Sequence, residues 1–295
     1  MKIAHVAAFA KAGNASNILS PDAVKRMIQK RSTKQIEWVD IEARDTPDNT
    51  TIELINGCAL LIIGGGGLFL PDATHNEVSG WQWPVSVKQI NDIQVPIYLR
   101  SVGFNLFRDQ RDFSENFNAS IQALACKCNY IGLRDSGSIY AIRKYLPYDL
   151  HSKIILDPCP TTIANKLYPE PPANPNSGQY KIGVNIAFDR EKLRYGNRAE
   201  KLCADIAEGI KRAEIRNKRR LNIEYFSHLN IDDKGYEILK TYIPWIKYRS
   251  LGKMNCKEII GIYKILKDSD DFDEDWDPYE IDFDEFKEML LEGGN

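Results

Sequence analysis

The sequence lacks an apolar run long enough to cross a membrane. Its longest apolar stretch, 59–70, is interrupted by four glycines and is shorter than the roughly 20 residues that a membrane-spanning helix needs. The first nine residues carry His5 within their apolar part and no small-residue cleavage site, so they predict a strand and not a signal peptide. We therefore expect a cytoplasmic protein, whose contact with a membrane would be peripheral.

Motifs for common cofactors and metals are also missing. No Gly-Lys-Ser/Thr follows the glycines at 64–67, which excludes the phosphate loop of nucleotide hydrolases, and no Gly-x-Gly-x-x-Gly opens a helix after the first strand. The six cysteines form no zinc-binding pattern, since Cys126 and Cys128 have the wrong spacing and no second pair completes a site. We expect reduced, structural cysteines, no metal and no cofactor.

Charge is distributed unevenly along the chain. Residues 268–295 hold 13 Asp and Glu and one Lys, which leaves 28 acidic and 38 basic residues in the first 267. The body is therefore about +10 and the C-terminal segment −12, so this acidic tail is expected to pack on the basic body or on a partner chain. The basic stretch at 211–220 indicates either a nucleic-acid contact or a charged helix end beside the tail. We expect the second and no nucleic acid.

Apolar runs and helical patterns alternate along the chain, which predicts an α/β fold with a doubly wound parallel sheet. The expected strands are 2–9, 35–41, 58–63, 95–103, 130–134 and 153–156, and the expected helices are 20–30, 50–56, 113–126 and 135–146. Ser20, Pro21 and Asp22 form the start signal of the first of these helices.

A proline-rich stretch at 168–179 is the clearest domain boundary. It separates a Rossmann-like N-terminal domain, 1–167, from a smaller and incomplete α/β domain, 180–267, and the acidic tail follows at 268–295. The expected elements of the second domain are strands at 180–187, 221–227 and 246–250 and helices at 198–212, 232–242 and 256–266. Phe283, Phe286, Met289 and Leu290 would share one face of a short amphipathic helix in the tail.

The glycines at 64–67 follow a short apolar run that predicts a buried parallel strand. Glycine permits positive φ and lets a ligand approach the backbone amides closely. Because ligands bind at the carboxyl ends of strands in open α/β sheets, Gly64, Gly65, Gly66 and Gly67 are expected to form a wall of the site. The alternative is a tight turn with close packing of the backbone.

Several landmarks occur in order along residues 1–267. They are Gly13-Asn14, Gly64-Gly65-Gly66-Gly67-Leu68, Arg100-Ser101-Val102-Gly103-x-Asn105, Gly132-Leu133-Arg134-Asp135-x-x-Ser138 and Asp157-Pro158. This arrangement resembles the polysaccharide pyruvyl transferase family. The resemblance implies a two-domain plan of the GT-B type and transfer of an enolpyruvyl group from phosphoenolpyruvate to a sugar hydroxyl of a surface polysaccharide. Phosphoenolpyruvate would be the donor substrate, and a sugar or polysaccharide precursor the acceptor.

The chemistry of the donor agrees with the charged residues at two strand ends. A phosphate and a carboxylate need Arg or Lys and free backbone amides, and Arg134 precedes a helix start, where an anion would also meet the helix dipole. The alternative for Arg134 is an ion pair with Asp135 that fixes the turn. Arg100 occupies an equivalent strand end. Asp157 is the candidate catalytic base, or else a turn residue before proline.

The remaining candidates line the expected substrate site. Asn14 and Asn17 would hydrogen-bond an acceptor sugar or form Asx turns. The resemblance also implies contacts from the following residues: Gly13, Ser101, Asn105 and Ser138.

Two departures from the family pattern weigh on the activity. The first loop of many relatives reads Gly-Asn-x-Gly-Asp, whereas Asn17 stands here in the place of the Asp. Relatives also carry a Met-Arg-x-His motif near the C-terminus that is thought to hold the donor, and no Arg or His follows Arg249 in this chain. An inactive binding or regulatory relative therefore stays an alternative. A nucleotide-sugar glycosyltransferase of the same two-domain plan is a second one.

Overall fold

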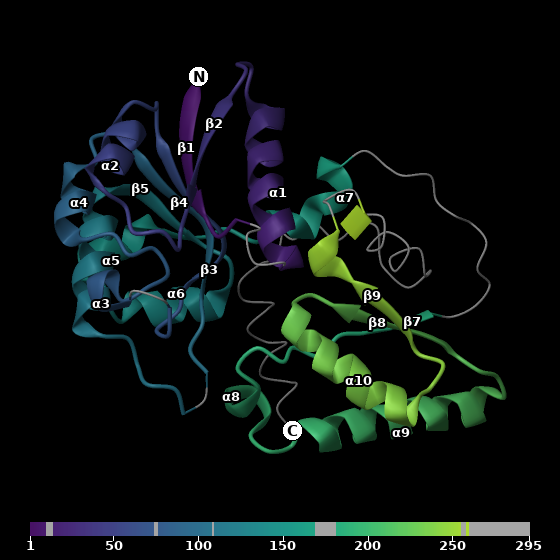
Figure 1. Cartoon of the computed structure of the whole chain (residues 1–295). Coiled ribbons are helices and arrows are strands. Elements are labelled where there is room, and N and C mark those ends of the chain that lie inside the picture. Colours follow the sequence, from purple (N-terminus) through teal and green to yellow (C-terminus); the bar gives the residue numbers. More distant parts are fainter. Residues whose placement is uncertain (10–13, 74–75, 108, 169–180, 255–257, 260–295) are drawn as a thin grey trace.

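The computed structural model describes residues 1–9, 14–73, 76–107, 109–168, 181–254 and 258–259, and these residues form two parallel β-sheets with helices against them (Figure 1). The first sheet has the strand order β2-β1-β3-β4-β5-β6. Its strands are Lys2–Ala7 (β1), Glu37–Glu42 (β2), Leu61–Phe69 (β3), Ile97–Phe104 (β4), Cys128–Leu133 (β5) and Ile154–Leu156 (β6). The predicted α/β class and parallel sheet are confirmed, in an arrangement consistent with a Rossmann-like fold.

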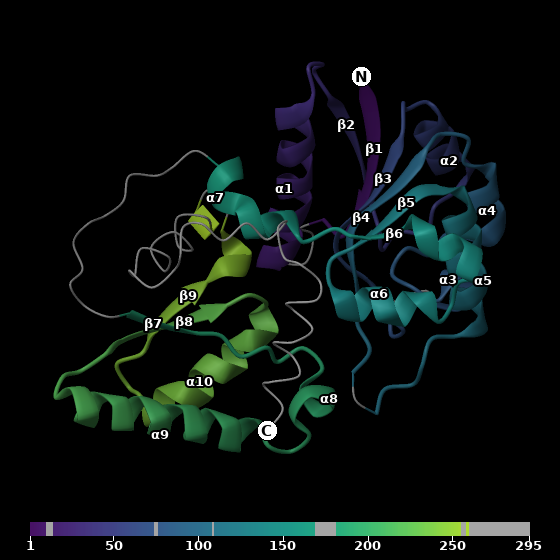
Figure 2. The same ribbon diagram turned by 180° about the vertical axis from the view of Figure 1, so that it is seen from behind.

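Helices cover both faces of the first sheet. Helices α2, α4 and α5 lie on one side of it and α1 on the other, as the two opposite views in Figures 1 and 2 show. The described helices of this half are Ala15–Arg31 (α1), Asn49–Asn56 (α2), Asn76–Ser79 (α3), Val87–Asp92 (α4), Glu115–Lys127 (α5), Ser136–Arg143 (α6) and Ala164–Leu167 (α7). The central strands are buried on both faces, which explains why their sequences are continuous apolar runs.

The strand order reverses direction at β1, which lies between β2 and β3. From β1 the chain first adds β2 on one side and then adds β3 on the other side, and β4, β5 and β6 follow in order beyond β3. In doubly wound sheets, the carboxyl ends of the strands on either side of such a switch point open a crevice where ligands bind. In this chain the glycines of β3 lie beside the end of β1.

The second sheet has the order β7-β8-β9, with Lys181–Val184 (β7), Asn222–Ser227 (β8) and Lys247–Ser250 (β9), all parallel. Helices Ala199–Asn217 (α9) and Asp233–Tyr242 (α10) pack on the same side of it, and the short helix Glu191–Tyr195 (α8) lies beside the first sheet's half (Figure 1). Tyr225, Leu239 and Ile243 are fully buried at the centre of this packing.

The prediction for the start of the first helix is wrong. Helix α1 begins at Ala15, not at Ser20, because Asn14 caps it by accepting a hydrogen bond from the backbone N–H of Ser16 (2.9 Å). Pro21 therefore lies inside the helix. The extra turn is stabilised by tertiary packing, since Ala15 and Leu19 are buried in a cluster with residues of the second half of the chain.

The prediction that the strand ends before the glycines is also wrong. Strand β3 continues through them to Phe69, and Gly64 and Gly66 pair with Arg100 and Val102 of β4. A Cβ at Gly64 would overlap the carbonyl oxygen of Arg100, and the φ of Gly64 is +155°. Close approach of two strand backbones therefore accounts for the first glycine of the run.

Contacts join the two sheets around the start of α1. The backbone N–H of Ala15 donates to the carbonyl of His228 (3.3 Å), just beyond β8. Tyr168 donates its hydroxyl to Asp22 of α1 (2.6 Å), and Arg26 lies over its ring. The acidic tail lies entirely outside the described residues, and so do most of the predicted linker and most of the predicted helix at 256–266.

No helix within the described ranges has the length and apolar character of a membrane span.

Candidate functional site

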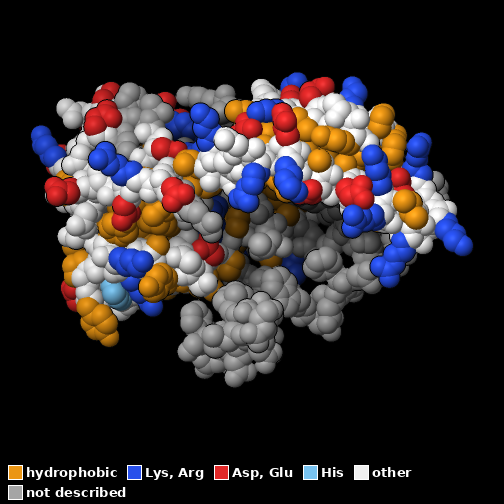
Figure 3. All heavy atoms as spheres, turned by 90° about the horizontal axis from the view of Figure 1, so that it is seen from below, with side chains coloured by type: hydrophobic (Ala, Val, Ile, Leu, Met, Phe, Trp, Pro, Cys, Tyr) orange, Lys and Arg blue, Asp and Glu red, His pale blue; other side chains and the backbone are white. Residues whose placement is uncertain are grey.

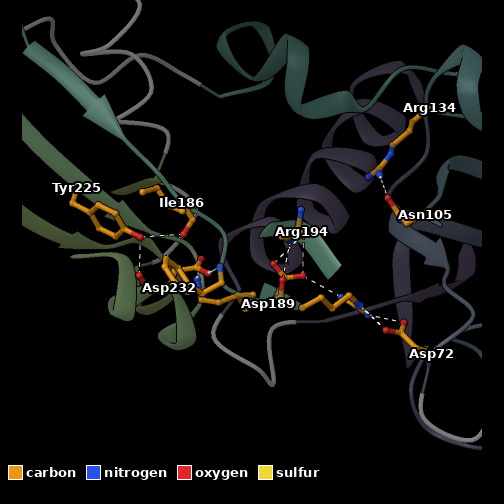
Figure 4. A network of polar contacts seen from close by, with 11 residues as sticks. Asp72, Asn105, Arg134, Ile186, Asp189, Arg194, Tyr225 and Asp232 are labelled. Atoms are coloured by element: carbon orange, nitrogen blue, oxygen red, sulfur yellow. Dashed lines mark hydrogen bonds and ion pairs between the residues drawn. The ribbon is translucent and has the colours of Figure 1, made fainter. Parts of the chain in front are cut away.

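Arg134 leaves the carboxyl end of β5 immediately before α6, as predicted. Its guanidinium is held from two sides: Nη2 donates to Oδ1 of Asn105 (3.1 Å), and Nε lies 3.4 Å from Oδ2 of Asp135. Asp135 is at the same time the N-cap of α6 and accepts the N–H of Ser138 (2.7 Å). The Arg134 side chain stays one-third exposed, 33%. Figure 4 shows Arg134 reaching toward Asn105 at the exit of β4.

Two glycines make room for this arrangement. A Cβ at Gly103 would overlap Nε and Cζ of Arg134, and a Cβ at Gly67 would overlap Nδ2 of Asn105. Only the absence of a side chain at both positions lets the guanidinium and the amide lie flat against the strand ends. At Gly66, by contrast, nothing lies within 4 Å of a Cβ, so this backbone faces open space.

We call Arg134, Asn105, Gly66, Gly67 and Gly103 the Arg134 site. It combines a partly exposed guanidinium, an amide side chain that orients it, and backbone without side-chain cover. A guanidinium fork of this kind recognises carboxylate and phosphate groups through paired hydrogen bonds. The residues therefore suit a small anion that carries either group.

The prediction that Arg100 lies at a strand end is wrong: it lies within β4, which continues to Phe104, and its guanidinium forms an ion pair with a buried carboxylate. Its Nε and Nη2 lie 2.8 and 3.0 Å from the two oxygens of Asp157, and its Nη1 donates to the hydroxyl of Tyr130 (3.0 Å). Oδ2 of Asp157 also accepts the N–H of Ser101 (3.0 Å). Asp157 is 7% exposed, and burial raises its pKa while Arg100 opposes the rise. Both carboxylate oxygens thus tie β4 to the end of β6, which is the geometry of a structural ion pair.

The two predicted serines also make internal hydrogen bonds. Ser101 is buried with a positive φ of 53°, and its hydroxyl donates to the carbonyl of Pro158 (2.9 Å). Ser138 is buried, and its hydroxyl accepts the N–H of Phe104 (3.0 Å). A positive φ in a residue other than glycine costs of order 1–3 kcal/mol and persists only where surrounding contacts enforce it. Both serines therefore shape the exit of β4 behind the Arg134 site.

The predicted residues of the first loop lie at the start of α1. Asn14 uses its side chain as the helix cap. The Nδ2 of Asn17 is buried and has no hydrogen-bond partner. Gly13 lies outside the described residues. Gly65 has a positive φ of 94° and packs against Pro21 of α1, where a Cβ would lie 3.2 Å from the proline Cα.

A cluster that the sequence analysis missed joins the two halves of the chain near this site. Arg190 follows β7, and its Nε and Nη2 bind the two oxygens of Asp72 at 2.6 and 2.8 Å, which lowers the pKa of Asp72. Asp189 accepts hydrogen bonds from Arg190 and Arg194, and both guanidinium groups lie over the ring of Phe107, at 5.5 and 4.7 Å from its centre. Figure 4 shows the contacts that link Asp72 to the group around Asp189 and Arg194, and separately the pair of Arg134 and Asn105. Charged residues just after a predicted strand were the signal available for Arg190.

The described residues include no group of three or more His, Cys, Asp or Glu side chains that could hold a metal ion. The described cysteines are free thiols.

The comparisons with known proteins give no family for this chain: no family model matches it, and no curated protein matches it either.

Proposed function

We propose that the Arg134 site binds phosphoenolpyruvate and that the chain transfers its enolpyruvyl group to a sugar hydroxyl of a polysaccharide precursor. The observation that carries this proposal is the guanidinium of Arg134, held across two glycines at the carboxyl edge of a parallel sheet, next to uncovered backbone at Gly66. It supports binding of a small molecule with carboxylate and phosphate groups. We infer phosphoenolpyruvate as the donor from the resemblance of the ordered motifs to those of polysaccharide pyruvyl transferases.

A two-domain plan of the GT-B type fits this proposal. The start of α1 contacts the end of β8 through Ala15 and His228, so the carboxyl edges of the two sheets approach each other there. An acceptor sugar would then lie between the sheets, near the unpartnered amide of Asn17, with the donor on the first sheet. In ketal formation, two sugar hydroxyl oxygens bond to C2 of the donor; one of their protons goes to the donor's methylene carbon, which becomes a methyl group, and the other leaves with the phosphate.

An inactive relative that only binds its ligand is the second candidate. Two observations favour it: Asp157, the predicted base, is held in a buried ion pair, and no Arg or His follows Arg249. Binding of phosphoenolpyruvate is common to both candidates, whereas release of phosphate with a glycan acceptor is expected of the enzyme alone.

Binding is tested first, by thermal unfolding with increasing phosphoenolpyruvate. A ligand at about 100 times its dissociation constant stabilises a protein by roughly 2.7 kcal/mol. We expect this shift in the wild type and not in Arg134→Ala. Arg143→Ala is the matched control, because Arg143 is an exposed arginine in the last turn of the same helix, α6.

The outcomes separate the candidates. An equal shift in wild type and Arg134→Ala would refute the assignment of the site, and no shift at millimolar ligand would refute phosphoenolpyruvate as donor. A shift caused by a uridine or guanosine diphosphate sugar instead would favour a nucleotide-sugar glycosyltransferase. Phosphate release in the presence of acceptor glycans then distinguishes turnover from binding alone.

A further inference from the structure

A basic hollow lies on the second sheet's half, at the edge where β8 and β9 begin. It has a volume of about 440 Å³, and its apolar floor includes Leu221 and Ile223 together with the partly exposed Trp245. Exposed arginine and lysine side chains form its rim: Arg219, Arg220 and Lys247. The guanidinium of Arg220 stacks over the Trp245 ring, 4.0 Å from its centre. This edge is opposite to the carboxyl edge of the same sheet, which lies at the start of α1.

Several cations on this side of the molecule have no acidic partner within the described residues. Some other surface cations of this half do have acidic partners, as in the pairs Arg212–Glu208 and Lys201–Asp205. Arg220 and Lys247 on the rim have no acidic partner among the described residues, and neither do Lys211, Arg216 and Lys218 in the segment that precedes the rim. Figure 3 shows Lys and Arg side chains gathered over this part of the surface. Unpaired cations around an apolar floor suit a ligand that is both acidic and aromatic.

The chain itself contains such a segment. Residues 268–295 carry a net charge of −12, and aromatic side chains alternate with the acidic ones: Phe272, Trp276, Tyr279, Phe283 and Phe286. The carboxylates would meet the basic rim, and an aromatic ring would fill the hollow beside Trp245. Basic rim and acidic segment thus match in charge and in apolar character.

The geometry of the chain permits the contact. The last described residue, Ile259, is buried in the cluster at the start of α1, close to the carboxyl ends of β8 and β9. The six residues of β8 span about 20 Å from that end to the hollow, and nine extended residues after Ile259 reach about 30 Å. Residue 268 can therefore arrive at the rim without any movement of the sheets.

We propose that the acidic segment 268–295 docks in cis on the basic hollow formed by Arg220, Trp245, Lys247 and their neighbours. The docked segment neutralises the unpaired cations and covers Trp245. This proposal is independent of the donor and of the reaction proposed above.

Zero-length cross-linking of the full chain with a carbodiimide tests it. The reagent joins a lysine amine only to a carboxylate in direct contact, and the joined peptides are identified by mass spectrometry. We expect links from Lys218 and Lys247 to the acidic segment. They should be lost in 1 M salt, where the screening length falls to about 3 Å. Lys88 and Lys144, on the first sheet's half, are the internal control and should give no such links.

Variants and isotope labels sharpen the result. Arg220→Glu should lower the yield of links at Lys218 several-fold, whereas Arg143→Glu, an exposed arginine of the other half, should leave it unchanged. In a mixture of ¹⁴N and ¹⁵N protein, docking in cis gives linked peptides of one label only. Mixed-label peptides would overturn docking in cis. Links spread evenly over all exposed lysines, or no links at the rim, would overturn the docking itself. Binding of a single-stranded oligonucleotide gives a second test. Equal binding by the wild type and by a variant with a neutralised acidic segment would also overturn the docking.

Discussion

Acidification to pH 5 should destabilise this protein through one buried histidine, His5 of β1. Its ring is fully buried, and Nε2 lies 3.1 Å from the carbonyl of Gly64. Nδ1 has no hydrogen-bond partner. Burial, and then the nearby Lys25, lower the pKa of His5 from 6.5 to about 4, which outweighs the opposing effects of the Gly64 hydrogen bond and Asp40.

The size of the effect follows from this lowered pKa. Above pH 6.5 the histidine is neutral in both the folded and the unfolded state, so it adds no pH dependence. As the pH falls below 6.5, the unfolded chain takes up a proton that the folded protein does not, and stability is lost progressively until about pH 4. Between pH 7.5 and pH 5 this linkage amounts to about 2 kcal/mol.

Urea denaturation of wild type and His5→Gln at both pH values measures this loss. The glutamine amide can donate to the Gly64 carbonyl as the ring does, but it does not titrate. We expect the wild type to lose about 2 kcal/mol more than the variant between pH 7.5 and pH 5. His228, whose pKa burial also lowers, contributes equally to both proteins and cancels in the comparison. An equal loss in the two proteins would refute the reasoning.

Two further predictions concern stability and the Arg134 site. Arg100→Leu should destabilise the protein by about 3 kcal/mol in urea titrations, because it leaves the Asp157 carboxylate buried and unpaired. The double variant Arg100→Leu/Asp157→Leu should recover part of that loss. A double variant that loses the sum of both single effects would contradict this. Gly103→Ala should displace only the guanidinium end of Arg134 and abolish the thermal response to phosphoenolpyruvate with a change in stability of about 1 kcal/mol or less. Gly209→Ala in α9, where a Cβ meets nothing within 4 Å, is its control and should keep the response while gaining about 0.5–1 kcal/mol.

The fold of the first half was predictable because its central strands are largely apolar, as burial on both faces of the sheet requires. The errors lie where tertiary contacts override local signals. Ser20 and Pro21 form a genuine helix start signal, but Asn14 offers a second cap, and the burial of Ala15 and Leu19 against the second sheet makes the longer helix the stable one. The glycines at 64–67 interrupt an apolar run in the sequence, yet β4 supplies backbone partners that keep them in the strand.

The candidate site was predictable only in part, for a related reason. The sequence predicts that Arg100 and Arg134 lie at equivalent strand ends and offers no way to rank them, but β4 continues beyond Arg100 to Phe104, whereas Arg134 directly follows β5. The structure also separates them through Asp157, which lies 57 residues beyond Arg100 and pairs with its Nε and Nη2. The ion pair between Arg190 and Asp72 joins residues 118 apart, and no local pattern reports such a contact.

The exit of β4 has a mechanical consequence for the whole chain. Asn105 orients Arg134, and two residues later Phe107 lies against Arg190 and Arg194 of the other half. Only one residue separates Asn105 from Phe107. A ligand that shifts Asn105 is therefore expected to displace the Phe107 ring, which Arg190 and Arg194 of the second half contact. If binding of an anion at the Arg134 site shifts Asn105, it is coupled to the contact of Phe107 with Arg190 and Arg194, and the coupling free energy is the same in both directions. The three residues from Asn105 to Phe107 thus connect the Arg134 site directly to the contact between the two halves.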